Sequence, residues 1–210
     1  MTHPPQLEFW FDYASTYAYV SAMRIGALGR AAGVEVIWRP FLLGPIFKDQ
    51  GLNTSPFVAV PIKGQYMVRD IERIATARGL PFRMPASFPA HSVLAARVGL
   101  VAAEGGWIAD YSRALFTAEF GPPHQDISDR HVIASIVNSL GQPETTLDQA
   151  ETPTTKQALR DQTERARALG IFGSPTFLTP RGELFWGDDR LESALTWILD
   201  EAERSLRVDP

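Results

Sequence analysis

The sequence predicts an α/β protein in which the two ends of the chain build one small sheet and a large helical block is inserted between them. Three observations support this fold class: a strand–helix–strand pattern at the start, a pattern of two strands and a helix at the end, and only helical patterns in between. With 210 residues, of which 45% are hydrophobic, the chain is long enough for one well-buried core.

The first unit is expected at the start of the chain. Residues 7–11 are apolar apart from Glu8, and residues 15–32 carry apolar side chains at helical spacing. Gly33 suits the end of that helix, and residues 34–38 are β-branched and aromatic enough for a second strand. Two strands joined through a helix in so short a stretch form a βαβ unit, so we expect them to be parallel.

The last unit has a different pattern. Residues 175–178 and 183–186 are short apolar runs separated by the turn sequence Thr-Pro-Arg-Gly, which predicts a β-hairpin. After Gly187, residues 188–192 resemble an N-terminal helix cap with an acid three residues on, and residues 191–199 carry an apolar helical stripe. A ββα unit is therefore expected to complete the sheet.

Between these units, residues 57–165 carry helical patterns, which prolines divide into separate helices, and no convincing strand. This chain order is that of a thioredoxin fold with a large helical insertion. The expected division is a thioredoxin-like domain of residues 1–56 and 166–210 and an inserted helical domain of residues 57–165. Because such sheets bind ligands at the C-terminal ends of their parallel strands, Ser15 lies where a ligand is expected.

Composition excludes several classes of function. The formal net charge is −4 and the basic residues are scattered, so no nucleic acid is expected as a partner. The N-terminus lacks the pattern of a signal peptide, and no apolar run approaches the roughly 18 residues that span a bilayer. We therefore expect a cytoplasmic protein that does not bind a membrane.

Cysteine is absent from the sequence, which excludes disulfides, thiolate metal sites and cysteine nucleophiles. Any sulfur chemistry must use a thiol from another molecule. His124, Asp126, Asp129 and His131 match no compact metal-ligand spacing and are better explained by an exposed loop that enters a helix, so no metal site is expected.

Ser15 stands at the start of the first predicted helix, where free backbone N–H groups and the helix dipole favour an anion. A thiolate there would be stabilised, and the hydroxyl could donate a further hydrogen bond to the sulfur. Because free thiols have a pKa of about 8.5, even a modest lowering makes the thiolate abundant at neutral pH. The alternative is that Ser15 is only an N-cap, the commonest role of serine in this position.

Ser174-Pro175-Thr176, which enters a predicted strand, is the second signal. A cis bond between Ser174 and Pro175 would turn the Ser174 backbone toward the first helix, where it could pair with a peptide ligand like an added strand. A trans bond is the more frequent form, so the tripeptide alone leaves both conformations open.

Longer segments are more specific. These are Phe9-Trp10-Phe11-Asp12-Tyr13-Ala14-Ser15-Thr16-Tyr17-Ala18-Tyr19, Gly170-Ile171-Phe172-Gly173-Ser174-Pro175-Thr176-Phe177 and Leu184-Phe185-Trp186-Gly187-Asp188-Asp189-Arg190. They resemble the 2-hydroxychromene-2-carboxylate isomerases and the kappa-class glutathione transferases, which belong to the DsbA-like branch of the thioredoxin fold. The resemblance continues through residues 47–56 and the helical middle, and covers nearly the whole chain.

The resemblance implies that glutathione is the cofactor. It implies that Ser15 contacts the glutathione sulfur and that Ser174, before a cis Pro175, pairs with the tripeptide backbone. It also implies that the γ-glutamyl end is held by the segment Trp186, Gly187, Asp188 and Asp189. The alternative for either aspartate is that it only caps the following helix.

By the same resemblance, Phe47, Lys48, Asn53 and Phe88 line the electrophile site. Lys48 could steer an acidic substrate, and Asn53 could bind a substrate oxygen or the tripeptide, although a solvated loop also explains both residues. The resemblance is imperfect at two positions, because Thr16 stands where the isomerases have proline and Phe88 where a substrate-contacting tyrosine is expected. The loss of that hydroxyl leaves the particular substrate open.

The leading hypothesis is a glutathione-dependent isomerase of an aromatic α-keto acid, of the 2-hydroxychromene-2-carboxylate or hydroxybenzylidenepyruvate type, in the catabolism of aromatic compounds. A kappa-like transferase or peroxidase would use the same site but consume glutathione. The alternative of another class is a thioredoxin-fold protein that binds an extended peptide without chemistry. A homodimer is expected only by analogy with these relatives.

Overall fold

The computed structural model of the chain describes residues 4–208. In chain order, its elements are β1 (Gln6–Phe11), α1 (Thr16–Ala32), β2 (Glu35–Pro40), α2 (Leu43–Asp49), α3 (Pro56–Ala59), α4 (Pro61–Ala77), α5 (Val93–Glu104), α6 (Ile108–Phe120), α7 (Arg130–Ser139), α8 (Thr145–Ala150), α9 (Pro153–Ala168), β3 (Thr176–Leu178), β4 (Leu184–Trp186), the short 3-10 helix η1 (Asp188–Arg190) and α10 (Leu191–Val208).

The four strands form one mixed sheet in the order β2-β1-β3-β4. Strand β1 runs parallel to β2, with Phe9 opposite Trp38, and antiparallel to β3, with Phe9 opposite Phe177. Strand β4 is the antiparallel partner of β3. The expected βαβ unit and C-terminal hairpin are thus confirmed. The strand that leads to Ser15 lies inside the sheet rather than at its edge.

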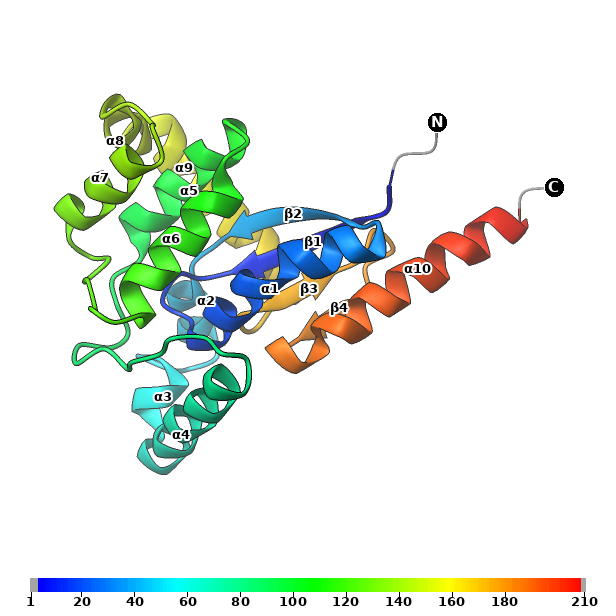
Figure 1. The fold of residues 1–210 in the computed structure, drawn as a ribbon, viewed down its shortest axis with the longest axis horizontal. Helices are drawn as coiled ribbons and strands as arrows, with labels where there is room; N and C mark the ends of the chain where they lie inside the picture. Colours follow the sequence, from blue (N-terminus) through cyan, green and yellow to red (C-terminus); the bar gives the residue numbers. More distant parts are fainter. Residues whose placement is uncertain (1–3, 209–210) are drawn as a thin grey trace.

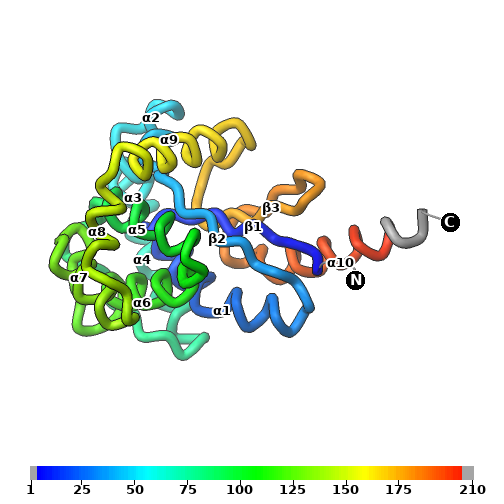
Figure 2. Tube along the Cα trace, turned by 90° about the horizontal axis from the view of Figure 1, so that it is seen from above, coloured from blue at the N-terminus to red at the C-terminus, as the bar shows by residue number. Residues whose placement is uncertain are grey.

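Helices cover both faces of the sheet. Figure 1 shows α1 and α10 in front of it, and Figure 2 shows α2 and α9 on the side opposite α1. Because side chains alternate along a strand, Phe9 and Phe11 of β1 enter the larger core with α1, whereas Trp10 packs with Ile46 of α2 and Ala166 of α9. The residues that follow β1 are therefore flanked by α1 on one side and α2 on the other.

The middle of the chain forms the expected block of helices, α3 to α9, and contains no strand between residues 57 and 165. In this block, α5 packs on β2, α6 and α4 pack on α1, and α9 packs on α2. The domain boundary expected after residue 165 falls inside α9, so in the structure the helical block ends at Ala168.

The start of the last helix differs from the expectation. The side chain of Asp188 makes no capping bond; Gly187 is the N-cap of η1, and α10 begins after it. The expected capping role of Asp188 is therefore wrong. The reason is a set of distant partners, described below. Within residues 4–208, no helix has the length and apolar character needed to cross a bilayer.

Candidate functional site

Ser15 is the N-cap of α1. Its backbone is extended, with φ −92° and ψ 117°, and its Oγ accepts a hydrogen bond from the N–H of Ala18 at 3.2 Å. The same hydroxyl donates to the carbonyl oxygen of Ser174 at 2.9 Å. The N-cap interpretation is confirmed, and the hydroxyl proton is directed at the second segment that the sequence singled out.

Two backbone donors beside Ser15 remain free. The N–H of Ser15 donates to the carbonyl oxygen of Asp12 at 3.0 Å, and that of Ala18 is taken by the Ser15 hydroxyl. The N–H groups of Thr16 and Tyr17 have no acceptor within residues 4–208, since the first turn of a helix offers none. These donors and the positive end of the α1 dipole favour an anion at this point.

The loop between α9 and β3, residues 169–175, faces this helix start and is called the Ser174 loop below. The bond between Ser174 and Pro175 is cis, as one of the two sequence interpretations required. The Ser174 hydroxyl accepts a hydrogen bond from the N–H of Asp12 at 3.0 Å, and the Pro175 carbonyl accepts from the N–H of Gly187 at 3.0 Å. The loop is thus tied both to the end of β1 and to the end of β4, with the Ser174 backbone turned toward Ser15.

The sequence interpretation did not single out Asp12, whose side chain is only 5% exposed. Its Oδ1 accepts from the N–H of Ala14 at 2.9 Å and from the Ser92 hydroxyl at 2.7 Å, and its Oδ2 accepts from the N–H of Leu43 at 2.8 Å. Burial raises the pKa of this carboxyl, while the three hydrogen bonds act in the opposite direction. A charged residue directly after a buried strand and before the helix that Ser15 caps was the signal that could have identified it.

An exposed pair of aromatic side chains borders the Ser174 loop. Trp186 is 51% exposed and Phe172 is 44% exposed, and their ring centroids are 4.9 Å apart. Gly173 lies under the indole ring, because a Cβ at this position would be 2.2 Å from the Trp186 Nε1. Trp186 therefore lies next to the Ser174 backbone, where the sequence expected it to contribute to a ligand site.

The two aspartates after Trp186 have different surroundings. Asp188 is 2% exposed, and its carboxylate accepts from the Ser21 hydroxyl at 2.8 Å and pairs with Arg24 and Arg78. Asp189 is exposed, and Arg190 at 3.5 Å is its ion-pair partner. The Asp188 carboxylate is thus committed to other side chains, and the Asp189 carboxylate is the one that a ligand can reach.

The end of α2 contacts the segment before Ser174. Gln50, just past the helix, donates to the Phe172 carbonyl at 3.4 Å, and Asp49 forms an ion pair with Arg167 at 2.5 Å. Lys48 of the same turn is exposed, and Phe47 is half-buried. Phe47 and Lys48 therefore belong to the helix whose C-terminal end contacts the segment before Ser174.

Asn53 and Phe88 are less closely placed. Asn53 is exposed in the turn between α2 and α3. Phe88 is half-buried, and its ring contacts the Phe57 ring of α3 with a centroid distance of 5.0 Å. No hydrogen bond, ion pair or ring contact among residues 4–208 joins either of them to Ser15.

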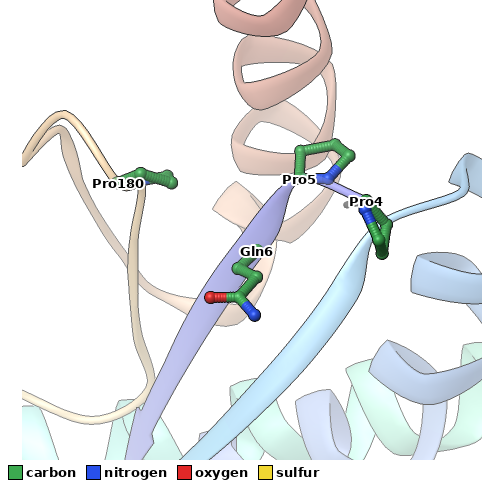
Figure 3. A pocket seen from close by; sticks show the side chains of 4 residues that line it. All are labelled: Pro4, Pro5, Gln6 and Pro180. Carbon is green, nitrogen blue, oxygen red and sulfur yellow. The ribbon is translucent and has the colours of Figure 1, made fainter. Parts of the chain in front are cut away.

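A shallow hollow lies at the other end of β1 (Figure 3). It is lined by Pro4, Pro5, Gln6 and Pro180, whereas Ser15 lies just beyond the opposite end of the strand.

The polar side chains of the loop around His124 bond to nearby groups of the same region. His124 bonds the Glu119 carbonyl, Asp126 accepts from Ser128, and Asp129 caps α7. The described residues contain no group of three or more side chains able to hold a metal ion.

Comparison with known proteins gives consistent matches. The chain is 27% identical to 2-hydroxychromene-2-carboxylate isomerase of Sphingobium xenophagum over 92% of this chain and 98% of that protein. It is 26% identical to glutathione S-transferase kappa 1 of Rattus norvegicus over 94% of this chain and 92% of that protein. A solved structure of 2-hydroxychromene-2-carboxylate isomerase superposes with a TM-score of 0.84 at 21% identity, covering 98% of this chain and all of the other.

The fold agrees with these matches. The model of the DSBA-like thioredoxin domain matches residues 6–197, which is nearly all of the chain. The protein therefore belongs to the family of DSBA-like thioredoxin domains.

Proposed function

We propose that this protein is a glutathione-dependent isomerase of an aromatic α-keto acid, of the 2-hydroxychromene-2-carboxylate or hydroxybenzylidenepyruvate type. The observation that carries the proposal is the position of Ser15. In a chain without cysteine, its hydroxyl and two free N–H groups favour a thiolate directly opposite the Ser174 backbone. The similarity to an isomerase and to a glutathione transferase supports this assignment.

The residues of the site fit glutathione. The Ser174 backbone can pair with an extended peptide, and the exposed Asp189 carboxylate can accept from an ammonium group. When bound, glutathione supplies a thiol that adds to a conjugated double bond, leaves a single bond free to rotate, and departs again unchanged.

Ser15 would keep the thiol ionised. In this structure the Ser15 hydroxyl donates to the Ser174 carbonyl oxygen at 2.9 Å. The hydroxyl can rotate and donate to the sulfur instead, while its oxygen continues to accept from the N–H of Ala18. The free N–H groups of Thr16 and Tyr17 would add to the same effect. Both contributions stabilise the thiolate over the thiol and so lower the thiol pKa.

Residues of α2 would receive the electrophile. The exposed Lys48 ammonium is our candidate for pairing with the acid and neutralising the enolate that develops on addition. We assign Phe47 and Phe88 to the walls of this site and Asn53 to a substrate oxygen. Because Phe88 has no hydroxyl, it offers the substrate apolar contact only.

The second candidate is a kappa-like glutathione transferase, which the similarity to the rat enzyme favours. It would use the same thiolate site but release a conjugate. Net consumption of glutathione distinguishes it from the isomerase, in which glutathione is recovered.

The test is the ultraviolet absorbance change of 2-hydroxychromene-2-carboxylate with the purified protein, with and without a catalytic amount of glutathione. We expect a reaction that requires glutathione without consuming it. Ser15→Ala should lower kcat/KM by about 100-fold, because losing this donor to the thiolate raises the thiol pKa and so lowers the ionised fraction at neutral pH. The pKa of bound glutathione, followed by thiolate absorbance, should rise in this variant.

A second substitution separates this chemistry from helix capping. Ser15→Asp keeps an N-cap acceptor for Ala18 but has no proton to donate to the sulfur or to the Ser174 carbonyl, so it should lose activity although α1 remains capped. Full activity of Ser15→Asp would contradict the proposed role. Stoichiometric loss of glutathione would favour the transferase, and absence of glutathione binding would eliminate both candidates.

A further inference from the structure

Asp12 joins three separate parts of the structure through one buried carboxylate. Oδ1 bonds the Ser15 turn, through Ala14, and the residue before α5, Ser92, whereas Oδ2 bonds only Leu43, the first residue of α2. The backbone N–H of Asp12 also donates to the Ser174 hydroxyl. The two carboxylate oxygens therefore serve different elements, and this division makes their effects separable.

The carboxylate replaces a cap that α2 lacks. The N-cap position of α2 is Leu42, whose side chain cannot accept a hydrogen bond, and Ser15, Ser55, Asp129 and Thr152 fill that position in other helices. Oδ2 of Asp12 takes the N–H of Leu43 from across the fold and puts a negative charge at the positive end of the helix.

This arrangement is costly for the fold. Among the side chains of residues 4–204, no Lys, Arg or His forms an ion pair with Asp12, so the donors that offset the burial of its charge are neutral. Helix α2 has seven residues, and Ile46 is its one buried residue. A short helix with so little buried surface depends strongly on the few polar contacts at its start.

Helix α2 carries Phe47 and Lys48, and Asp12 is three positions before Ser15. We propose that Asp12 is a positioning residue, which holds α2 at a fixed place relative to Ser15 and thereby sets the affinity for the acidic aromatic substrate without touching it. This inference rests on the proposed function for the identity of the substrate. It requires that loss of the Oδ2 hydrogen bond weakens binding of the aromatic acid and leaves binding of glutathione unchanged.

Two substitutions break the same bond from opposite ends. In Asp12→Asn, the amide oxygen can still accept from Ala14 and Ser92, but the amide nitrogen faces the N–H of Leu43. Leu43→Pro removes that N–H itself. Proline is tolerated at the first position of a helix, and Leu42 before it is already extended, with φ −111° and ψ 123°.

Both variants should raise the KM for 2-hydroxychromene-2-carboxylate by about tenfold, the loss expected for one hydrogen bond to a charged group. The KM for glutathione and the pKa of bound glutathione should stay within about twofold and about 0.3 units of wild type, since the contacts of Ser15 persist. The control is Asp129→Ala, which removes the cap of α7 and should lower the melting temperature with both KM values unchanged.

Equal effects on both KM values, or no effect on either, would overturn the inference and leave Asp12 a purely structural residue. If wild type binds glutathione but turns over no aromatic acid, the proposed function fails first. Amide hydrogen exchange then tests whether Asp12 holds α2. Faster exchange that is confined to residues 43–49 in both variants supports the inference. Exchange that is unchanged in α2, or that also becomes faster in α1, overturns it.

Discussion

Thr16, which follows Ser15, has a buried side-chain hydroxyl that forms no hydrogen bond in the fold. It is fully buried, and its Oγ1 has no hydrogen-bond partner. A buried hydroxyl without a partner loses its bonds to water and gains none. We predict that Thr16→Val, which has the same shape, raises the free energy of unfolding by about 1 kcal/mol and the melting temperature by about 3 °C.

The matched control is Thr163→Val in α9. Thr163 is equally buried, but its hydroxyl donates to the Leu159 carbonyl at 2.9 Å and accepts from the N–H of Leu42 at 3.3 Å. This substitution should therefore destabilise the protein. Thermal unfolding of both variants checks the pair, and a loss of stability in Thr16→Val would contradict the account of its hydroxyl.

Glu119 of α6 is a second buried group with an incomplete set of partners. Its Oε2 accepts from the N–H of Ile127 at 3.2 Å, and its Oε1 has none. Burial raises the pKa of this carboxyl to about 7, while the hydrogen bond from Ile127 and the charge of His124 act to lower it and the charge of Asp126 acts to raise it. Between pH 4.5 and about 7 the unfolded chain releases this proton while the folded chain keeps it, so stability falls as the pH rises.

We predict that Glu119→Gln removes this pH dependence. The free energy of unfolding of the variant should equal that of wild type near pH 4 and exceed it above pH 7, by up to about 3 kcal/mol. Urea unfolding at pH 4 and pH 8 measures both values. A difference that is the same at the two pH values would mean that the gain does not come from the titration of Glu119.

Single residues also differ in how far the sequence reveals them. Ser15 was predictable because its role depends on neighbours in the chain, the end of one strand and the start of one helix. The donors to Asp12 include Leu43 and Ser92, which are 31 and 80 positions away. The charged residue after a buried strand marks Asp12 as a candidate, but nothing in the local pattern encodes those contacts, so its partners are known only from the folded structure.

At the scale of elements, Asp188 joins η1 to two helices from other parts of the chain. It contacts Ser21 and Arg24 of α1 and Arg78 at the end of α4. Asp188→Ala would remove the buried acid that pairs with both Arg24 and Arg78, and would leave Arg24 with Glu192 as its acidic partner. We predict a loss of about 3–5 kcal/mol in the free energy of unfolding, measured by chemical denaturation.

Asp189→Ala is the control for this prediction, because the neighbouring carboxylate is exposed and pairs only with Arg190 at 3.5 Å. Its effect on stability should be below about 1 kcal/mol. Similar losses in the two variants would contradict the assignment of the buried ion pairs to Asp188. The sequence favoured a helix cap at this position because the acid pattern is local, whereas the partners Ser21 and Arg78 are 167 and 110 positions away.

At the scale of the whole molecule, the order of units in the chain was sufficient to predict the fold. The βαβ start, the helical block and the hairpin each follow from contiguous patterns, and their assembly allows few alternatives. The sequence alone does not give the relation between the parts: which face α2 covers, how α4 is fixed to η1, and which acids face inward. Those features depend on packing between segments far apart in the chain.

The hydrogen bond between Ser15 and Ser174 spans 159 positions, and β3 pairs with β1 across 166 to 170 positions. During synthesis, β1, α1 and the entire helical block leave the ribosome before the strand that completes the sheet. Closure of so long a loop is entropically costly and is repaid only when the C-terminal hairpin docks. The backbone that faces Ser15 is therefore the last to reach the sheet, and a chain cut before residue 174 would lack the carbonyl that accepts from the Ser15 hydroxyl.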